Sequence, residues 1–437
     1  MVDGTAGKMI PSRERLWEPQ FKETVLTMSA DTSYAKTIRF TNTLLAREHD
    51  SLITRTLIDL AWREGHKAGE CYKEKRNTIL SQYGFNAETG QLEDSSRLPD
   101  NVINPNPDHS EEDLAEYAAK IGQLIETYNS DHEVGISMTV PEIISALEYV
   151  PDDAVVICID EVGVKHQKEY RKEENRKKAQ AKLSPEEVKL ENAENVETAV
   201  AYIRCAEGIY RIAEKTITLA LLTALAFLLS NGLLADRRLL FFTDGARNLK
   251  RAIESIYSFR PFTINLDWIH VKKYCYQLLT MALYGGKENH DRNEKIRSGF
   301  FNYIWVGDIE GSKKYLDSID NSYIKNPKKI QAVKDYLDRK SGNSDQQYFY
   351  CYAMRKELGL INSSNQGEKS NDILIAQRQK HNGMSWVVDG SSALGHIKQI
   401  SINEESDYFY RTGKITFEPV KLTKTIQEKY KYRSMVV

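Results

Sequence analysis

The pattern of hydrophobic and polar positions changes near residue 150, and the part before this point is predicted to be mainly helical. Apolar residues recur every three or four positions over 35–85, the spacing of amphipathic helices. Residues 86–135 contain a polar stretch rich in acidic residues and proline, which predicts a linker or exposed loop. A short helix is expected at 140–150. Residues 1–150 therefore form an N-terminal region in which 35–85 is a candidate helix-turn-helix.

After residue 150, apolar and β-branched runs predict a series of strands separated by helices. Two of these strands are joined as a hairpin near Glu207 and Gly208. The expected strands lie at 154–160, at two positions within 196–216, at 238–244 and at 262–267, and the expected helices at 217–229, at 246–257 and from 268 onward. An order with hairpin strands first and crossover helices later indicates an α/β fold.

Two charged helical segments interrupt this series. The first, 165–197, begins with a stretch at 166–182 that has seven basic and three acidic residues. A solvated helix is one interpretation of this stretch, and contact with DNA phosphates is the other. The second segment, from 287 to about 360, is rich in lysine and shows no strand pattern.

The charge distribution indicates which part of the chain would meet a polyanion, and the cysteine pattern argues against some kinds of site. The chain of 437 residues has a formal net charge of −2, but residues 1–150 have 15 Lys and Arg against 25 Asp and Glu, and the remainder has 45 against 37. A polyanion would therefore meet the second part of the chain first. Five cysteines occur without a CxxC motif or a Cys/His cluster, which argues against zinc and disulfides.

No segment predicts a membrane location. The run 217–229 is shorter than the roughly 20 residues that a membrane-spanning helix needs. The first residues also lack the apolar core of a signal peptide. We therefore expect a cytoplasmic protein, associated with the nucleoid when bound to DNA, and no membrane partner.

Three carboxylates are candidates for chemistry. Asp160 and Asp244 each end a predicted strand, and Glu368 lies on a predicted helix. Two carboxylates at neighbouring strand ends repel each other unless a cation lies between them, and oxygen ligands of this kind suit Mg²⁺. A third carboxylate would allow two ions to be held, as metal-dependent phosphodiester chemistry requires.

Plainer interpretations of these acids stay open. Asp160 is also explained as a turn residue at a strand end, and Asp244 as the N-cap of the next helix. Glu368 is also explained as an ordinary surface glutamate. Asp372, Asp389 and Glu404 are then substitutes for it.

Four motifs in order resemble a known family: IDEVGVK, FFTDGARN, LDWIHVKKY and EKSNDILIAQRQKHNGMSW. The set resembles bacterial insertion-sequence transposases with a DDE catalytic triad, in a group allied to mutator-like elements, over roughly residues 150–400. The resemblance implies an RNase H-like core, an α/β fold with a mixed sheet flanked by helices and a helical insertion before the last acidic residue. It also implies that Asp160, Asp244 and Glu368 are the catalytic residues and hold two Mg²⁺ ions, with Mn²⁺ as a substitute.

Several further residues are candidate DNA contacts on this resemblance. Asp267 and His270 form an Asp-x-x-His motif beside the expected active site, although Asp267 is equally explained as a helix cap. Trp386 is either a core residue or a base-stacking residue. The full set of DNA-binding candidates is Asp267, His270, Lys272, Lys273, Arg378, Lys380 and Trp386. The aromatic and basic tail 408–433 either lies on a nucleic-acid surface or packs on the core.

These patterns together lead to an expected function and domain plan. We expect a transposase that cleaves DNA at transposon ends by metal-dependent hydrolysis and joins the freed 3′-hydroxyl to target DNA, as a homodimer or larger assembly. An RNase H-like nuclease of the resolvase type and a domesticated, inactive DNA-binding protein are the alternatives. The expected parts are 1–150, a first part of the core at 151–285, an insertion at 286–360, and the last part of the core at 361–437.

Overall fold

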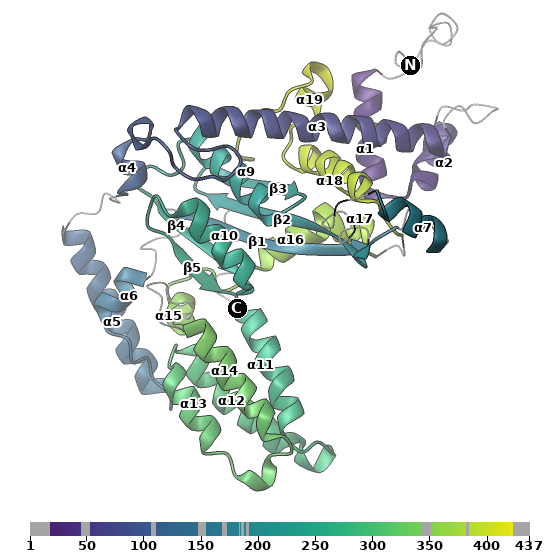
Figure 1. Ribbon diagram of the computed structural model, residues 1–437. Helices are drawn as coiled ribbons and strands as arrows, with labels where there is room; N and C mark the ends of the chain where they lie inside the picture. The colour runs from purple at the N-terminus through teal and green to yellow at the C-terminus, as the bar shows by residue number, and fades with distance from the viewer. Residues whose placement is uncertain are drawn as a thin grey trace, which may run out of the picture.

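A mixed sheet of five strands forms the centre of the computed structural model, with helices packed against both of its faces (Figure 1). The structure describes residues 18–44, 53–105, 111–146, 154–167, 173–182, 192–341, 351–381 and 384–422, with 184 and 188. The strands are β1 (Ala154–Lys165), β2 (Asn195–Cys205), β3 (Gly208–Glu214), β4 (Arg238–Thr243) and β5 (Thr263–Leu266). The predicted strands and the predicted α/β class are confirmed.

The strand order is β3-β2-β1-β4-β5, so β1 is the central strand and has β2 on one side and β4 on the other. Its first half pairs in parallel with β4, from Ala154 opposite Arg238 to Cys158 opposite Phe242. Antiparallel pairing with β2 continues to Lys165. β2 and β3 form the predicted hairpin, and β4 and β5 are parallel.

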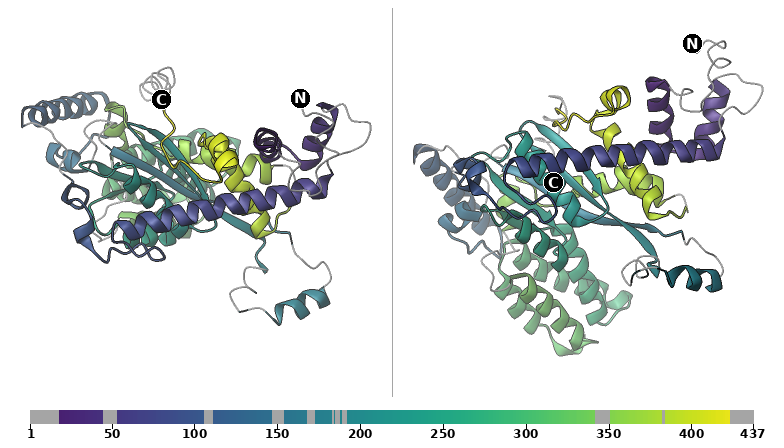
Figure 2. Two further views of the ribbon diagram at one scale, coloured as in Figure 1. Left: turned by 90° about the horizontal axis from the view of Figure 1, so that it is seen from above. Right: turned by 45° about the horizontal axis from the view of Figure 1, so that its top comes forward.

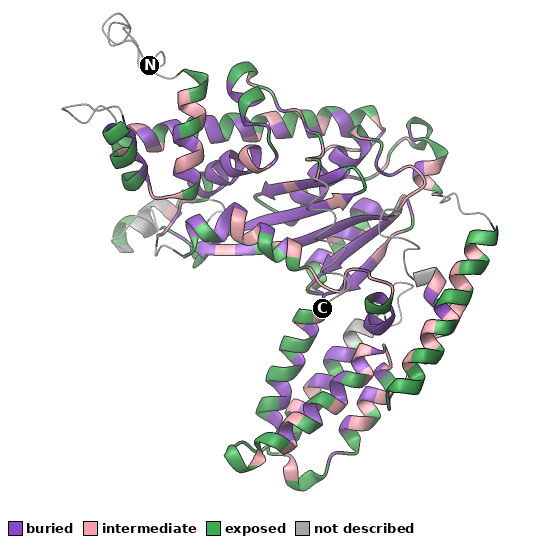
Figure 3. Cartoon of the chain, turned by 180° about the vertical axis from the view of Figure 1, so that it is seen from behind, coloured by how far each residue is buried: buried purple, intermediate pink, exposed green. Residues whose placement is uncertain are grey.

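Both faces of the sheet are covered, and Figure 3 shows its strands as largely buried. Val155, Ile157 and Ile159 of β1 belong to the main hydrophobic core, whereas Val156 and Cys158 belong to a separate cluster on the opposite face. This alternation follows from the two-residue repeat of a strand. Asp160 continues the second set, so its side chain lies on the face that carries Val156 and Cys158.

The helices before and between the strands are α1 (Pro19–Asp31), α2 (Tyr34–Leu44), α3 (Thr54–Gln82), α4 (Asp100–Ile103), α5 (Glu111–Asp131), α6 (Val140–Ala146), α7 (Glu173–Gln180), α9 (Ile217–Ser230) and α10 (Arg247–Tyr257). α9 is apolar on all sides and almost wholly buried, as a helix inside a core must be. It packs between the sheet and the long helix α3. In the described residues, no helix is long and apolar enough to cross a membrane.

The later helices are α11 (Trp268–Ala282), α12 (His290–Trp305), α13 (Ile309–Asp317), α14 (Pro327–Ser341), α15 (Tyr352–Glu357), α16 (Asn365–Asn371), a π-helix (Asp372–Ala376), α17 (Gln377–Gln379), α18 (Val388–Ile402) and α19 (Ser406–Thr412). α11 to α14 form a helical lobe beside the sheet, which begins before the predicted insertion 286–360 and includes α11 (Figure 1). α18 returns to the sheet and packs against α3 and β3.

Close packing between α3 and α18 attaches the N-terminal helices to the core. A Cβ atom at Gly65 of α3 would lie 2.2 Å from the carbonyl oxygen of Ala393 in α18, so only glycine allows this approach. Glu405, fully buried beyond α18, adds a polar link. It accepts hydrogen bonds from the hydroxyls of Tyr72 in α3 and Tyr210 in β3, and from the Phe417 amide at 2.7 Å.

One expectation about the connecting segments needs correction. The predicted acidic linker 86–135 contains a 21-residue helix, α5, within it. Ile121 is fully buried in α5, and Tyr117, Leu124 and Tyr128 pack around the same small hydrophobic cluster. An apolar stripe at helical spacing is therefore present, and the acidic residues on the exposed side concealed it.

The aromatic residues of the C-terminal tail pack on the core where the structure describes them. Phe409 and Phe417 are almost completely buried, and Val420 pairs with Ile209 at the edge of β3. The part of the tail after 422 lies outside the described residues. In the first charged segment, α7 extends away from the sheet near the end of the β1–β2 hairpin (Figure 2). Its contact with DNA stays a prediction.

The buried Glu405 network predicts a large loss of stability when its acceptor is removed. Glu405→Ala would leave the Tyr72 and Tyr210 hydroxyls and the Phe417 amide without this acceptor, at a cost of about 3 kcal/mol in the free energy of unfolding. Urea unfolding measures this cost. Glu418→Ala, at an exposed position nearby, is the matched control, with a change of about 0.5 kcal/mol or less. Equal effects of the two substitutions would contradict the network.

The hairpin carries an ion pair whose contribution depends on pH. Arg237 donates to Glu207 at 2.6 Å, and this hydrogen bonding lowers the pKa of Glu207 to about 2. The pair therefore stabilises the fold above the unfolded pKa of about 4.3, and this contribution is lost as the pH falls toward 2. Because the Glu207 side chain is 41% exposed, the expected contribution is about 1 kcal/mol or less. Wild type and Glu207→Gln should therefore differ in unfolding free energy at pH 7, and the difference should shrink below pH 4 and vanish only as the pH reaches about 2.

Candidate active site

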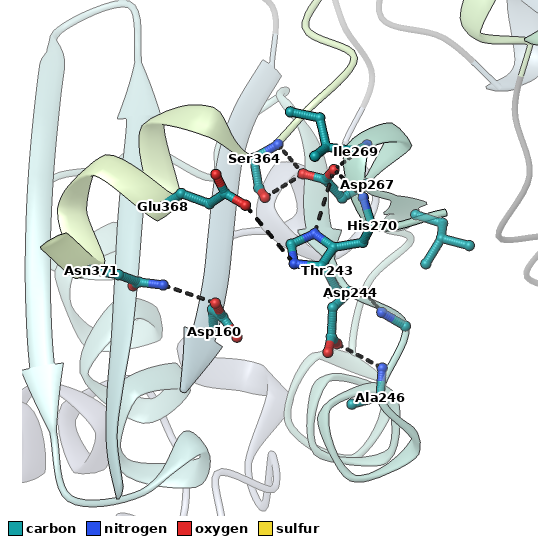
Figure 4. Close-up of polar contacts among 12 residues, drawn as sticks. Asp160, Thr243, Asp244, Ala246, Asp267, Ile269, His270, Ser364, Glu368 and Asn371 are labelled. Carbon is teal, nitrogen blue, oxygen red and sulfur yellow. Dashed lines mark hydrogen bonds and ion pairs between the residues drawn. The ribbon is translucent and has the colours of Figure 1, made fainter. Parts of the chain in front are cut away.

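Three carboxylates from distant parts of the chain meet at one side of the sheet (Figure 4). Asp160 lies on β1, Asp244 follows β4, and Glu368 lies on α16. The parallel register places Cys158 opposite Phe242, and the same register extended by two residues places Asp160 beside Asp244. The expectation that Asp160 ends its strand is wrong, because β1 continues to Lys165 by pairing with β2.

Asp160 is the most enclosed of the three acids. One of its oxygens accepts a hydrogen bond from the Asn371 amide at 2.8 Å, and the other accepts from the Glu161 backbone N–H at 2.8 Å. Burial raises the pKa of Asp160, and the nearby charge of Asp244 raises it further. The hydrogen bonds and the charge of His270 lower this pKa and only partly offset these effects.

Asp244 is exposed at the turn between β4 and α10. Its carboxylate accepts a hydrogen bond from the Ala246 amide at 2.8 Å, which is an Asx-turn. Gly245 has a φ of 81°, a conformation that favours glycine. Ala246, and not Asp244, is the N-cap residue of α10. The turn therefore holds Asp244 at the end of the strand without the capping role that the plainer interpretation gave it.

α16 carries Glu368 and is held tightly against β1. A Cβ atom at Gly367 would lie 2.7 Å from the Cβ atom of Cys158, so this position needs glycine. A π-helix follows directly at Asp372–Ala376, and such segments often mark functional sites. Glu368 is 46% exposed in its side chain, and its nearest ionic neighbour is His270, with a distance of 3.9 Å from Nε2 to the carboxylate.

Asp267 joins the two helices that border the site. It is fully buried, and one of its oxygens caps α11 by accepting from the amides of Ile269 and His270. The other oxygen accepts from the amide and hydroxyl of Ser364, the N-cap residue of α16. Burial acts to raise the pKa of Asp267, but the hydrogen bonds outweigh it, and the net pKa is lowered.

His270 lies between the buried aspartate and the acidic site. Its Nδ1 is 3.5 Å from Asp267, and the interaction with this carboxylate is the main cause of a raised pKa. The charges of Asp160 and Glu368 raise this pKa further, whereas burial opposes the change. His270 therefore supplies the positive charge nearest to Glu368 among the ion pairs of the described residues.

The donor set of the site fits a hard divalent cation. In the described part of the chain, no three His, Cys, Asp or Glu side chains are already arranged as a metal-binding group. Asp160, Asp244 and Glu368 nevertheless offer carboxylate oxygens, which Mg²⁺ prefers. The buried amide oxygen of Asn371 beside Asp160 has no hydrogen-bond donor. A cation here would relieve the repulsion between Asp160 and Asp244 and give this oxygen a partner.

The predicted DNA contacts differ in burial, and His270 is partly exposed, so its contact with DNA stays a prediction. Lys272, Lys273 and Lys380 are exposed, and their contact with DNA stays a prediction. The burial of Asp267, Arg378 and Trp386 corrects the expectation that they contact DNA.

Arg378 and Trp386 are parts of the core. The Arg378 guanidinium donates to the Ser29 carbonyl at 2.9 Å and lies over the Trp386 ring. The Trp386 indole donates to Gln379, and its backbone pairs with the end of β1. Trp386 is therefore the core residue that one of its two interpretations described.

The substitutes considered for Glu368 lie in other surroundings. Asp372 faces Lys369 and His381, and Asp389 forms an ion pair with Lys215 at 3.0 Å. Glu404 lies in a turn after α18 with a φ of 58°. Glu368 is therefore the candidate that the structure brings toward His270.

Sequence reasoning gave no role to Asn371 and Ser364. Asn371 follows Glu368 by three residues, a spacing that places both side chains on one face of a helix. Ser364 precedes a helical segment, and serine at this position is a common cap. Both signals were readable, but the partners, Asp160 and Asp267, lie 211 and 97 residues away.

No family model, curated protein or solved structure matches this chain, so the interpretation of the site rests on its geometry.

Because Asp267 accepts hydrogen bonds from both α11 and Ser364, its substitution should destabilise the fold more than substitution of Ser364 does. Asp267→Asn would have one acceptor oxygen in place of two, and its NH₂ group would face N–H or O–H donors on one side. We therefore expect the free energy of unfolding to fall by about 3 kcal/mol. Ser364→Ala removes only the hydroxyl and keeps the backbone hydrogen bond, so the free energy of unfolding should fall by only about 1 kcal/mol. Chemical denaturation measures both. A smaller loss for Asp267→Asn than for Ser364→Ala would contradict the bridging role.

Proposed function

We propose that this protein is a DNA transposase whose active site is formed by Asp160, Asp244 and Glu368. The observation that carries the proposal is the convergence of these three acids, which are separated along the chain by strands, helices and the helical lobe. Such a set of carboxylates suits metal-dependent cleavage of phosphodiester bonds. The resemblance of the four motifs to insertion-sequence transposases supports the choice of this reaction over others.

The fold supports the proposal in its coarse features. The sheet is mixed, helices cover both faces, and a helical insertion precedes the segment with the last acidic residue. These are the features expected of an RNase H-like core, which we propose for residues 151–285 and 361–437. The site lies on a rigid sheet, which holds Asp160 and Asp244 at fixed positions.

The carboxylates would hold Mg²⁺, or Mn²⁺ in its place, and we propose two ions. The ions would supply activation of the attacking oxygen and neutralisation of charge on the phosphate. Asn371 fixes the orientation of Asp160 by donating to it at 2.8 Å. Asp267 fixes the starts of α11 and α16, and so the positions of His270 and Glu368.

The DNA would approach along exposed basic residues near the site. Lys272 and Lys273 are exposed on α11, two and three residues after His270, and Lys380 is exposed after α17. Positive side chains in these positions can contact backbone phosphates on either side of a scissile bond. We propose DNA, as transposon ends and as target, for the partner, with two copies of the chain bringing the two ends together.

Cleavage of DNA tests the proposed active site. The substrate is the genomic segment that flanks the gene, incubated with Mg²⁺ or Mn²⁺ and purified protein. Asp244→Asn should reduce cutting about 100-fold or more, because it removes one charge from the metal-binding set. Asp59→Asn, exposed on α3 and far along the chain from the site, is the matched control and should cut normally.

The outcomes separate the alternative functions. Cutting that joins the new 3′-ends to a target plasmid supports transposition, and cutting without joining indicates a nuclease of the resolvase type. Equal cutting by wild type and Asp244→Asn would reject the assignment of this site. Binding of the ends without cutting by either protein would indicate a DNA-binding protein without catalysis.

A further inference from the structure

A buried histidine lies where the long helix α3 packs on α18 (Figure 1). This residue, His396 of α18, is only 7% exposed. A Cβ atom at Gly69 of α3 would lie 2.7 Å from both Nδ1 and Cε1 of the His396 ring. The ring therefore lies directly against the backbone of α3, and this edge of the ring has no room for a water molecule. The proposed active site uses neither residue.

The packing around His396 suits a neutral imidazole and not a charged one. A neutral ring carries an N–H on one nitrogen, whereas a protonated ring carries an N–H on both. Among the described residues, Nδ1 of His396 has no hydrogen-bond partner. The Tyr72 ring lies 6.1 Å from the imidazole, and its hydroxyl donates to Glu405. Protonation would therefore bury a charge and an unsatisfied N–H together, which is costly in a packed interior.

The groups that face His396 come from α3, from β3 and from the residue after β3. Burial lowers the pKa of His396 and is the largest effect on it. The charge of Glu214 in β3 and hydrogen bonding to the Gly65 backbone in α3 raise this pKa. The charges of Lys215 and His66 lower it, and the net pKa lies below the ordinary value.

Glu214, the acidic group among these, is already engaged by other side chains. It is buried and accepts hydrogen bonds from Arg76 of α3 at 3.3 Å and from Thr223 of α9 at 2.9 Å. The Arg76 charge balances the Glu214 charge, so little attraction is left for an imidazolium. These contacts also hold the second half of α3, whereas the first half packs on α18 through Gly65 and Gly69.

We propose that the contact between the first half of α3 and α18 is sensitive to acid, so that protonation of His396 releases residues 54–72. The second half of α3 stays attached through Arg76. Above about pH 6.5, the ordinary value for histidine, the ring is neutral in both the packed and the released chain. As the pH falls below this value, the released chain takes up a proton that the packed chain does not, so release becomes more favourable. Acid would therefore detach part of the segment 35–85, the candidate helix-turn-helix.

A second buried group in this contact responds to pH in the opposite direction. Burial raises the pKa of Glu405, because it disfavours the charged carboxylate. Glu405 therefore takes up a proton more readily in the folded chain, and a falling pH favours attachment through this group. A comparison of wild type with a variant that keeps Glu405 and lacks the titrating ring isolates the effect of His396.

Amide hydrogen exchange tests the inference, which does not rest on the proposed function because no DNA or metal ion is needed. Full-length protein is measured between about pH 7.5 and about pH 5, and each rate is divided by that of an unstructured peptide at the same pH. For peptides from 54–72, the opening constant of wild type divided by that of His396→Gln should rise about tenfold for each pH unit below about 6.5. At about pH 5, the wild-type opening constant for 54–72 should exceed that for β1 by about 100-fold or more.

His66→Gln is the matched control, because His66 is an exposed histidine on the same helix. This variant should keep the pH dependence of wild type. A second measurement needs no substitution at His396. The hydrogen on the ring carbon between the two nitrogens exchanges slowly with solvent, at a rate that depends on protonation of the ring. In wild type, the midpoint of this exchange for His396 should lie below about pH 6.5.

Three results would overturn the inference. A ratio of wild-type to His396→Gln opening constants that stays the same at every pH would show that this ring does not control the contact. Equal opening constants for 54–72 and for β1 at every pH would show that the whole chain unfolds together. A midpoint for His396 at or above about pH 6.5 would show that the packed ring accepts a proton without penalty. Each of these results leaves the proposed function in place, since DNA cleavage is measured separately.

Discussion

The region of the proposed active site depends on one buried carboxylate, Asp267, which accepts hydrogen bonds from α11 on one side and from Ser364 on the other. Four donors converge on it, two from the start of α11 and two from Ser364. In sequence, the helical lobe lies between the start of α11 and Ser364. Asp267 therefore joins the two ends of the segment that contains the lobe. A charged group with all its acceptor positions occupied is tolerated in the interior, whereas an unpaired one is not. The same contacts that stabilise Asp267 therefore fix the distance between His270 and Glu368.

The sheet provides the second constraint, because β1 extends beyond its pairing with β4. Only Ala154–Cys158 pair in parallel with β4, whereas the antiparallel pairing with β2 runs from Val156 to Lys165. Asp160 lies just after the pairing with β4 ends, where the pairing with β2 continues. The strand there has a free edge on the side of Asp244, and α16 covers the face. This arrangement leaves the Asp160 carboxylate partly buried, held by Asn371 and close enough to Asp244 for its charge to act on it.

The sequence predicted much of the core because its patterns are local. Alternating apolar runs predicted β1 to β5 and the hairpin at Glu207, and the uniformly apolar run predicted the buried α9. Contacts between distant segments were not predictable in the same way. Arg378 looks like a surface cation in the sequence, yet its partner is the Ser29 carbonyl, 349 residues earlier. The length of β1 also depended on pairing with β2, which no single run of residues discloses.

The route of the chain has a consequence for the order of events during synthesis. Asp160 and Asp244 are made early, but Glu368 and Asn371 come from the last part of the chain to be made. Glu405 and Val420 must then dock on Tyr210 and Ile209 before the outer edge of the sheet is closed. A nascent chain on the ribosome therefore has an incomplete set of acids until nearly all of these residues have emerged. Translation itself delays the appearance of the assembled site, and a chain interrupted before α16 would lack both Glu368 and the α18 packing on α3.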